Sequence, residues 1–403
     1  MKISINSLKL VIKNNIPIAI FLIAFIVRLS FVIYETDIPS SDAAYYDRLS
    51  ISISKGYGYV DDNGAPDSFS PPFYPAFLAI IYKFFGHSYF AVRFIQSIIG
   101  AFTSVFIFLI GKRAYSFFVG IAASFISIAY LPFIKSAGLL RTENIFTFIL
   151  ILIVFYLLRI QENIKLRDSI MLGLLLGLSI LTKSVMLLFL LFVIPAFIYS
   201  PDSSFLKRLK NYAVVLLFII LSMSPWIVRN YIVYRQFVLV SAQGGLGFYS
   251  SYCPSKGVFG YMADNEDPVI LEASGIKSPV LRSNFLIKKT LSFILNNPWK
   301  VLALEVKKIL YLWAPLDWEI VGNRWFNVIY LAMLPFFAIG FLLSMKKFKN
   351  YYPILIPVIY FQIISLIFYG SPRFRLPIEP YIFILGAAGI AEIFKCQKSR
   401  TIC

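Results

Sequence analysis

Apolar runs of nearly membrane-spanning length recur along most of the chain and alternate with short polar stretches. A transmembrane helix needs about 20 consecutive, mainly apolar residues. The runs predict ten spans, at 16–34, 88–111, 117–134, 144–160, 169–183, 185–200, 212–228, 326–344, 351–369 and 379–395. The pattern therefore predicts an all-α polytopic membrane protein, built as one domain over residues 1–403.

Two of the polar segments between these spans are too long to be simple connectors. The first, 35–87, contains a candidate amphipathic helix at 42–55, then a turn rich in Gly, Asp and Pro, and then a helix of about 14 residues that begins at Pro72. The second, 229–325, contains a helix at 298–313 whose charges favour the membrane surface over an eleventh span. We predict that the helices of these first and fourth outer loops lie in the membrane interface.

Composition and charge agree with a membrane protein. Hydrophobic residues make up 59% of the chain and charged residues 14%, and the mean hydropathy is +0.77. A soluble domain has about a quarter of its residues charged. The net charge of +18 does not indicate nucleic acid, because most cations gather in short clusters between apolar runs, as they do on the cytoplasmic side of membrane proteins. The clusters are Lys2/Lys9/Lys13, Lys112/Arg113, Arg159/Lys165/Arg167, Lys207/Arg208/Lys210, Lys346/Lys347/Lys349 and Lys395/Lys398/Arg400.

The same distribution of charge predicts the orientation of the chain. If all six clusters face the cytoplasm, both termini are cytoplasmic in a multi-pass protein of the cell membrane. Residues 35–87 carry seven acidic residues against three basic ones, so we place this loop outside. The three cysteines form no metal or disulfide pattern, and His87 is the only histidine. We expect no metal cofactor, although the sequence does not exclude a divalent ion held by carboxylates.

Ionisable residues gather where the predicted spans reach the outer side. Such residues are costly at membrane depth, so each is a candidate for function. Two are carboxylates, Asp42 and Glu143, and five are cations: Arg141, Lys183, Arg229, Arg373 and Arg375. Guanidinium groups bind phosphate oxygens, and a nearby carboxylate can accept a proton. An outward-facing cavity that holds these groups would suit an anionic substrate carried by a lipid.

Each of these residues also has a structural interpretation. Asp42 can cap the helix predicted to follow it, and Glu143 can pair with Arg141 or cap its own span. Arg373 and Arg375 can be interfacial anchors. The stretch "GLLLG" at 173–177 is more typical of close helix packing than of chemistry.

Six motifs, in this order along the chain, resemble the polytopic glycosyltransferases of the GT-C fold. They are "SDAAYYDRLS", "SPPFYPAFLAIIYKFFG", "LLRTENIF", "GLLLGLSILTKS", "SPWIVRNY" and "SPRFRLPIEPYIFIL". The likeness is to the branch with dolichyl-phosphate-mannose protein mannosyltransferases and bacterial lipid A aminoarabinose transferases. In topology it covers nearly the whole chain.

This resemblance implies an inverting glycosyltransferase of the cell envelope that uses a sugar on a polyprenyl phosphate, a hexosyl or pentosyl donor. Asp42 matches the family's first-loop acid and would be the general base, and Glu143 would assist it. Arg141, Arg373 and Arg375, with Lys183 and Arg229, would hold the donor phosphate. We expect Tyr45 and Tyr46, beside Asp42, to bind substrate. The acceptor would be an extracytoplasmic glycan, lipid or protein.

One departure from the family pattern puts a protein acceptor in doubt. Asp42 is followed by Ala43, whereas the eukaryotic protein-directed members carry Asp-Glu. Two other functions also remain: a transporter or flippase of lipid-linked sugars, and a non-catalytic subunit of a polysaccharide assembly. Against a transporter stand the unequal halves of the chain, since many transporters are built from matched repeats.

Overall fold

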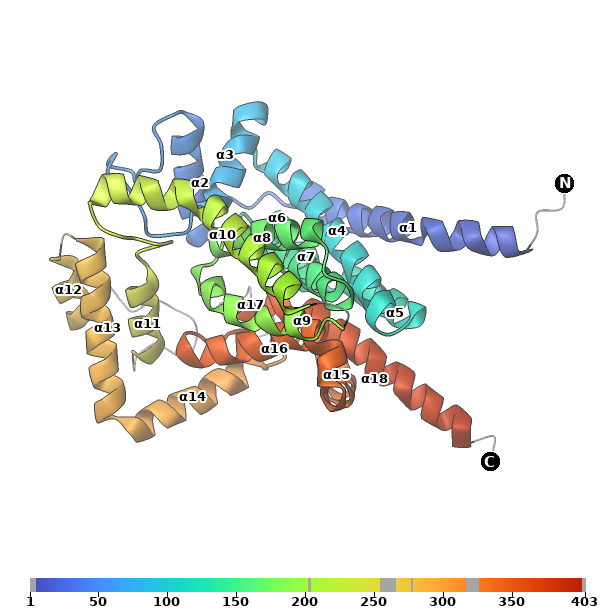
Figure 1. Cartoon of the computed structure of the whole chain (residues 1–403). Coiled ribbons are helices and arrows are strands. Elements are labelled where there is room, and N and C mark those ends of the chain that lie inside the picture. The colour runs from blue at the N-terminus through green and yellow to red at the C-terminus, as the bar shows by residue number, and fades with distance from the viewer. Residues whose placement is uncertain (1–4, 202–203, 254–265, 277, 317–325, 401–403) are drawn as a thin grey trace.

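The chain folds into a bundle of helices, seen in a computed structural model that describes residues 5–201, 204–253, 266–276, 278–316 and 326–400 (Figure 1). The helices are α1 (Ile5–Tyr34), α2 (Asp42–Ser54), α3 (Phe73–Phe85), α4 (Tyr89–Ala114), α5 (Phe117–Ala129), α6 (Leu131–Gly138), α7 (Glu143–Glu162), α8 (Leu166–Ile180), η1 (Ser184–Phe192), α9 (Ile194–Ile198), α10 (Phe205–Tyr234), α11 (Gly244–Tyr252), α12 (Pro268–Ser274), α13 (Pro279–Asn296), α14 (Pro298–Leu312), α15 (Val328–Lys346), α16 (Phe348–Ile367), α17 (Pro372–Arg375), η2 (Leu376–Ile378) and α18 (Glu379–Arg400). The predicted all-α class is confirmed.

Seven helical segments of the described chain are long and apolar enough to cross a membrane. They are α1 from Asn15, α4, α7, α10, α15, α16 and the continuous segment Pro372–Lys395. An eighth span arises if α5 and α6, which meet at a bend of 54°, are counted together. Hence the chain is a multi-pass membrane protein.

The predicted count of ten spans is not confirmed. The runs at 169–183 and 185–200 form α8, which has 15 residues, and the short pieces η1 and α9. The polar residues Thr182 and Lys183 separate α8 from η1, and Pro195 begins α9. Sequence hydropathy cannot distinguish such broken, protein-packed segments from full spans, because both bury apolar side chains.

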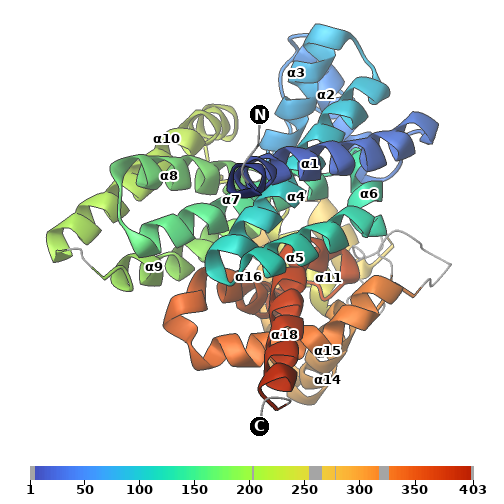
Figure 2. The ribbon, with the colours of Figure 1, turned by 90° about the vertical axis from the view of Figure 1, so that its right-hand side faces the viewer.

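The bundle has central and peripheral helices. In the spans of α7 and of Pro372–Lys395, 72% and 78% of the most apolar window is buried inside the protein, against 22% in α1 and 28% in α10. Figure 2 shows α8 and α10 on one flank of α7 and α1 and α4 on the other, with α15 and α18 below. The peripheral helices therefore present apolar side chains that lipid can cover.

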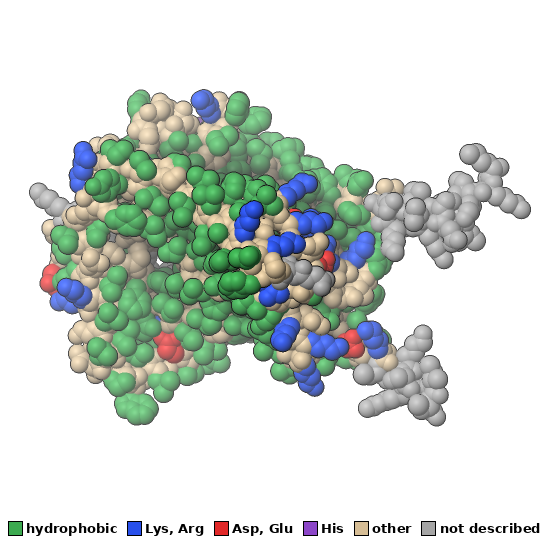
Figure 3. All heavy atoms as spheres, viewed as in Figure 1, with side chains coloured by type: hydrophobic (Ala, Val, Ile, Leu, Met, Phe, Trp, Pro, Cys, Tyr) green, Lys and Arg blue, Asp and Glu red, His purple; other side chains and the backbone are tan. Residues whose placement is uncertain are grey.

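The two long polar segments lie at the end of the molecule away from the termini. In Figure 1, α1 begins and α18 ends on one side, whereas α11 to α14 form the opposite side. Most Lys and Arg side chains visible in Figure 3 lie toward the side of the termini. The helices predicted at 42–55, from Pro72 and at 298–313 correspond to α2, α3 and α14.

Some residues of the predicted basic clusters lie outside the described residues. They are Lys2 and the side chains of Lys9, Lys13, Lys398 and Arg400, and Cys403 lies outside them as well. Parts of the predicted large loop, 254–265, 277 and 317–325, lie outside them too.

Glycines bring neighbouring helices into close contact. A Cβ added to Gly173 on α8 would lie 2.7 Å from the carbonyl oxygen of Val215 on α10, and one on Gly177 would lie 2.5 Å from Cβ of Ser222. The helix-packing interpretation of the "GLLLG" stretch is thus confirmed. The same close approach occurs between α15 and α18, where a Cβ on Gly340 would lie 1.9 Å from the carbonyl oxygen of Leu385.

Replacing Gly177 with alanine is expected to destabilise the fold by about 1–3 kcal/mol, because α8 and α10 must move apart to admit the methyl group. The measurement is the thermal unfolding midpoint of the purified protein in detergent. Gly244→Ala is the matched control, since no atom lies within 4 Å of the Cβ position at Gly244. Equal midpoints for the two variants would show that this contact does not limit stability.

Candidate functional site

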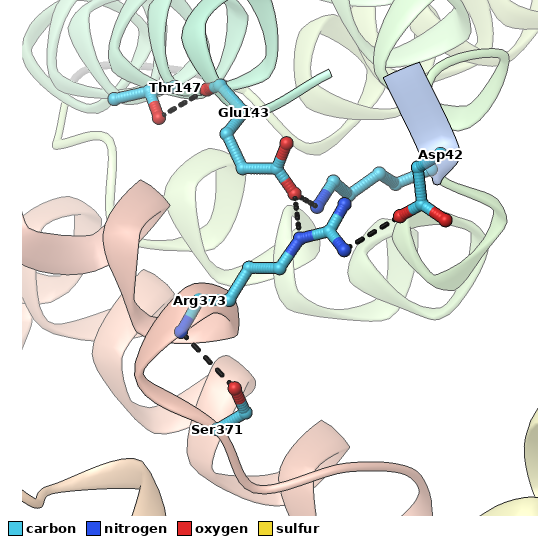
Figure 4. A network of polar contacts seen from close by, with 6 residues as sticks. Asp42, Glu143, Thr147, Ser371 and Arg373 are labelled. Carbon is cyan, nitrogen blue, oxygen red and sulfur yellow. Dashed lines mark hydrogen bonds and ion pairs between the residues drawn. The ribbon is translucent and has the colours of Figure 1, made fainter. Parts of the chain in front are cut away.

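Three segments that are far apart in the sequence meet at one arginine. Arg373, in α17, donates a hydrogen bond from Nη1 to Oδ2 of Asp42 at 2.7 Å and another from Nε to Oε1 of Glu143 at 2.8 Å (Figure 4). The ammonium of Lys183 donates to the same oxygen of Glu143 at 3.3 Å. We call Asp42, Glu143, Lys183 and Arg373 the carboxylate–cation cluster.

The helix ends that carry these residues explain their placement. Glu143 and Asp42 are the first residues of α7 and α2, where the helix dipole favours a negative charge. Arg373 lies in the single turn of α17, which Pro372 begins and which the Ser371 hydroxyl caps by accepting a hydrogen bond from the Arg373 amide.

The structure does not support the helix-cap interpretation of Asp42. Ser41 occupies the N-cap position of α2, has a positive φ of 53°, and makes no side-chain cap hydrogen bond. Asp42 instead directs its carboxylate toward Arg373. Its role in α2 is limited to the favourable charge of the first helical turn.

Exposure falls steeply through the cluster. The Asp42 side chain is 50% exposed and Arg373 is 25% exposed, whereas Lys183 is 16% exposed and Glu143 only 1%. Nη2 of Arg373 has no hydrogen-bond partner among the described residues. An external reactant would thus reach Asp42 and Arg373 first, and Glu143 forms the back of the site.

Aromatic rings and cations hold the buried part of the site in place. The Lys183 ammonium lies 5.3 Å from the ring centre of Phe146 and 5.5 Å from that of Phe374. Such cation–π contacts stabilise a partly desolvated ammonium. Since a buried carboxylate is strongly destabilising unless it is paired, Lys183 and Arg373 together allow Glu143 to stay ionised.

Tyr45 and Tyr46 lie on α2 beside the cluster. The Tyr45 hydroxyl donates to Oδ2 of Asp67 at 2.6 Å, and the Tyr46 ring packs edge-on against Tyr74 with ring centres 5.2 Å apart. Burial raises the pKa of both phenols, so each hydroxyl stays protonated at neutral pH and can donate a hydrogen bond.

Arg141 also belongs to the surroundings of the cluster. Burial is the largest cause that raises the pKa of Tyr46. The charges of Asp42 and Glu143 raise this pKa further, and those of Arg373 and Arg141 lower it. All four charged groups therefore lie within electrostatic range of one phenol. Of the five predicted cations, Lys183 and Arg373 thus contact Glu143, and the charge of Arg141 acts on the same surroundings.

Arg375 is a correction to the predicted phosphate-binding set. Its guanidinium points into the protein, is 1% exposed, and donates to Oε1 of Glu379 and to the carbonyl oxygens of Leu312 and Ala314. It also lies 3.6 Å from the ring centre of Tyr330. These contacts fasten the end of α14 to the start of α18, so Arg375 has a structural place in the fold.

Arg229 is likewise not brought to the cluster. It donates from Nη2 to the carbonyl oxygen of Tyr59 and from Nη1 to that of Asp67, each at 2.7 Å. Its guanidinium also lies 4.9 Å from the Trp226 ring centre. Arg229 thus holds the turn at 59–67 against α10, and through Asp67 it supports Tyr45 indirectly.

Sequence reasoning missed Asp67 as the partner of Tyr45, and the roles of Phe146 and Phe374 around Lys183. The sequence contained a signal for one neighbour of the cluster, Tyr46. It lies four residues after Asp42, so the two side chains share a face of α2. Asp47 lies off that face and accepts hydrogen bonds from the hydroxyls of Tyr82 and Tyr89 and bonds to His87, which packs α2 onto α3 and α4.

Arg373 lies between the two carboxylates of the cluster, because Asp42 and Glu143 both bind it. Across the described ranges of the chain, no group of three or more His, Cys, Asp and Glu side chains is close enough to hold a metal ion. A cation bound by both carboxylates would have to displace Arg373.

Part of the chain matches a known family. Residues 70–228 match the family model described as dolichyl-phosphate-mannose-protein mannosyltransferase. This region includes Glu143, Lys183 and Arg141, but ends before Arg373 and begins after Asp42. No curated protein matches the chain.

The chain is similar to several solved structures, and the archaeal ones share its fold. The archaeal oligosaccharyltransferase AglB from Archaeoglobus fulgidus, in complex with an inhibitory peptide and a dolichol-phosphate, has a TM-score of 0.60 and 15% identity, over 97% of this chain and 52% of that one. The apo form of the same oligosaccharyltransferase gives the same values. ArnT from Cupriavidus metallidurans bound to undecaprenyl phosphate has a TM-score of 0.47 and 12% identity, over 94% and 77%. The predicted GT-C-like fold is confirmed, and the chain spans about half the length of the oligosaccharyltransferase.

Proposed function

From this family match and shared fold, we propose that the protein is an inverting glycosyltransferase that takes a sugar from a polyprenyl-phosphate donor. The acceptor lies on the extracytoplasmic side of the membrane. The observation that carries the proposal is the carboxylate–cation cluster, which places one exposed carboxylate beside cations in a membrane protein of this fold.

The proposed reaction uses Asp42 as the general base. The acceptor hydroxyl oxygen attacks the anomeric carbon while the bond from that carbon to the phosphate oxygen breaks, which inverts the configuration. The acceptor proton passes to the Asp42 carboxylate, and the electron pair of the broken bond stays on the phosphate. Asp42 suits this role because half of its side chain is exposed to an incoming acceptor.

The cations of the site would stabilise the leaving group. Its negative charge grows as the bond breaks, so preorganised donors gain strength in the transition state. Arg373 has a partly exposed guanidinium with one nitrogen unoccupied, Lys183 binds the same oxygen of Glu143, and the charge of Arg141 acts on the same phenol, that of Tyr46. Glu143 would act through Arg373 and Lys183, by holding both in place.

The remaining expectations follow from the same proposal. The side of the termini, where most visible Lys and Arg side chains gather in Figure 3, would face the cytoplasm. The cluster would then face outward, where a cell-envelope glycan, lipid or protein can reach Asp42. The chain's own cations would replace a metal, because Arg373 occupies the position between the carboxylates.

The alternative of a lipid-sugar transporter gains no support from the similarities. The matched family model and the archaeal structures that share the fold are described as transferases. A transporter would also bind the donor, so binding alone does not separate the two functions. Cleavage of the donor does.

The test follows donor cleavage by the purified protein in lipid vesicles. A panel of radiolabelled polyprenyl-phosphate sugars is supplied with extracts of cell-envelope glycans, lipids or proteins, in EDTA and again in Mg²⁺. We expect release of free polyprenyl phosphate and transfer of label to one acceptor class, at equal rates in both buffers. Donor binding with no release under any condition would favour the transporter, and release that needs Mg²⁺ would contradict the proposed metal independence.

A further inference from the structure

Two connectors carry the carboxylates of the cluster, and both touch the same turn of α4. The first connector, residues 35–41, leads from α1 to Asp42, and the second, residues 139–142, leads from α6 to Glu143. Arg93 on α4 donates to the carbonyl oxygens of Glu35 and, at 2.5 Å, Asp37. Its Nε donates at 2.8 Å to the carbonyl oxygen of Gly138, which ends α6 beside the second connector.

Gln96 continues this contact from the same face of α4. Its Nε2 donates to the carbonyl oxygens of Ala137 at 3.0 Å and Leu139 at 2.9 Å, on either side of the carbonyl that Arg93 binds. Its Oε1 accepts a hydrogen bond from the Tyr74 hydroxyl at 2.9 Å. Gln96 is fully buried, so these bonds have no competition from water.

The chain segments held in this way also pack on each other. A Cβ added to Gly138 would lie 2.9 Å from the Phe31 ring and 3.1 Å from Cγ of Glu35. Any outward movement of one segment would therefore disturb the other. Two residues on one turn of α4 therefore contact the chain that leads to each of the two carboxylates.

We propose that Arg93 and Gln96 are positioning residues, which fix the separation of Asp42 and Glu143 on either side of Arg373. The inference rests on the proposed transferase function. Irregular connectors do not supply the helical hydrogen bonds that hold a backbone in place, so their carbonyls need other donors. Catalytic groups must be held within about 0.5 Å, and a misplacement of about 1 Å can reduce a rate about a hundredfold.

The bonding of Arg93 is directed at the backbone around both connectors. A cation buried in a span pairs with another ionisable group or with backbone carbonyls, and Arg93 makes its short contacts with carbonyls. The nearest carboxylate oxygen of Arg93 is Oε1 of Glu35, at 4.0 Å, whereas its three shorter contacts are all to backbone carbonyls. The planar guanidinium reaches chain segments on both sides at once, which an ammonium on a flexible stem cannot do.

The test combines turnover with amide hydrogen exchange in Arg93→Lys and Gln96→Met. We expect kcat to fall about a hundredfold in Arg93→Lys and about tenfold in Gln96→Met, with the donor KM changed less than threefold. We also expect faster exchange in the first connector for Arg93→Lys, and in residues 137–142 for both variants, because their carbonyls lose donors.

Arg28→Lys is the matched control for loss of a buried guanidinium. Arg28 is 1% exposed and donates to the carbonyl oxygen of Ala24 and the hydroxyl of Ser104, neither of which belongs to a connector. This variant should lose thermal stability with kcat unchanged.

Two results would overturn the positioning role. One is an unchanged rate of amide hydrogen exchange, in the variants, in the segments that Arg93 and Gln96 contact. This measurement needs no turnover, so it tests the positioning role even if the wild type transfers no sugar. The other is faster exchange with unchanged kcat in an active wild type, which refutes the positioning role while the proposed function stands.

Discussion

Replacing Asp42 with asparagine is expected to reduce transfer about 10²- to 10⁴-fold, the usual contribution of a general base. Asparagine keeps the size of the side chain and can still accept a hydrogen bond from Arg373. It cannot take a proton from the acceptor hydroxyl at neutral pH. The loss should therefore appear in the single-turnover rate constant of transfer, whereas the dissociation constant of the donor stays nearly constant. The measurement is the rate of polyprenyl-phosphate release with donor prebound.

Asp62→Asn is the matched control for this substitution. Asp62 lies in the same outer segment, and its side chain is 67% exposed and pairs with Arg48. We expect it to turn over like the wild type. A helix-capping role for Asp42 predicts a different result, namely a stability loss of about 1 kcal/mol with kcat of the folded protein unchanged. Turnover of Asp42→Asn within threefold of wild type would remove Asp42 from the mechanism.

Hydropathy predicted most of the fold because a bilayer imposes a length on each helix. The spans that were predicted well are those with uninterrupted runs, such as α4 and α7. The predicted runs that do not form one continuous helix are α5 with α6, α8, and η1 with α9, where short helices bend or break inside the protein. Their side chains are as apolar as those of true spans, and only tertiary packing shows how their ends are arranged.

The structure gathers some of the five candidate cations and not others, because sequence gives the position of a residue along a span but not the direction of its side chain. All five cations lie near the ends of helical segments, and topology alone could not separate them. Arg373 and Arg375 are two residues apart on one short helix, so they point in different directions: one toward Asp42 and the other toward Glu379. These directions depend on contacts between distant segments: Arg373 binds Asp42, and Arg375 binds carbonyl oxygens at the end of α14.

Arg93 and Gln96 illustrate a second limit of sequence reasoning. Arg93 is a cation inside the span of α4, and its short contacts are with backbone carbonyls. Every residue has a carbonyl, so no motif records which ones an arginine binds. Such contacts become visible only when the connectors are placed against α4.

Replacing Arg373 with alanine is expected to lower kcat/KM for the donor about 10²- to 10³-fold, the usual effect of removing one preorganised donor to a developing charge. Arg373→Lys should lie between alanine and wild type, because an ammonium keeps part of the attraction but cannot contact Asp42 and Glu143 together. Donor affinity, measured by equilibrium binding in vesicles, should weaken in the same order. This order distinguishes phosphate binding from interfacial anchoring, in which lysine would replace arginine without loss.

Loss of Arg373 also changes the pairing of Glu143, and this must be separated from the loss of phosphate binding. The buried carboxylate would keep Lys183 as a partner, so Arg373→Ala should fold with a lowered thermal midpoint. Arg373→Ala/Glu143→Gln also removes the excess negative charge that the loss of Arg373 leaves in the cluster, and should regain part of that midpoint without regaining donor affinity. Arg48→Ala, an exposed guanidinium on α2, is the control and should bind donor like the wild type. If the double variant recovers donor affinity together with stability, Arg373 serves only to neutralise Glu143, and the donor phosphate must be held elsewhere.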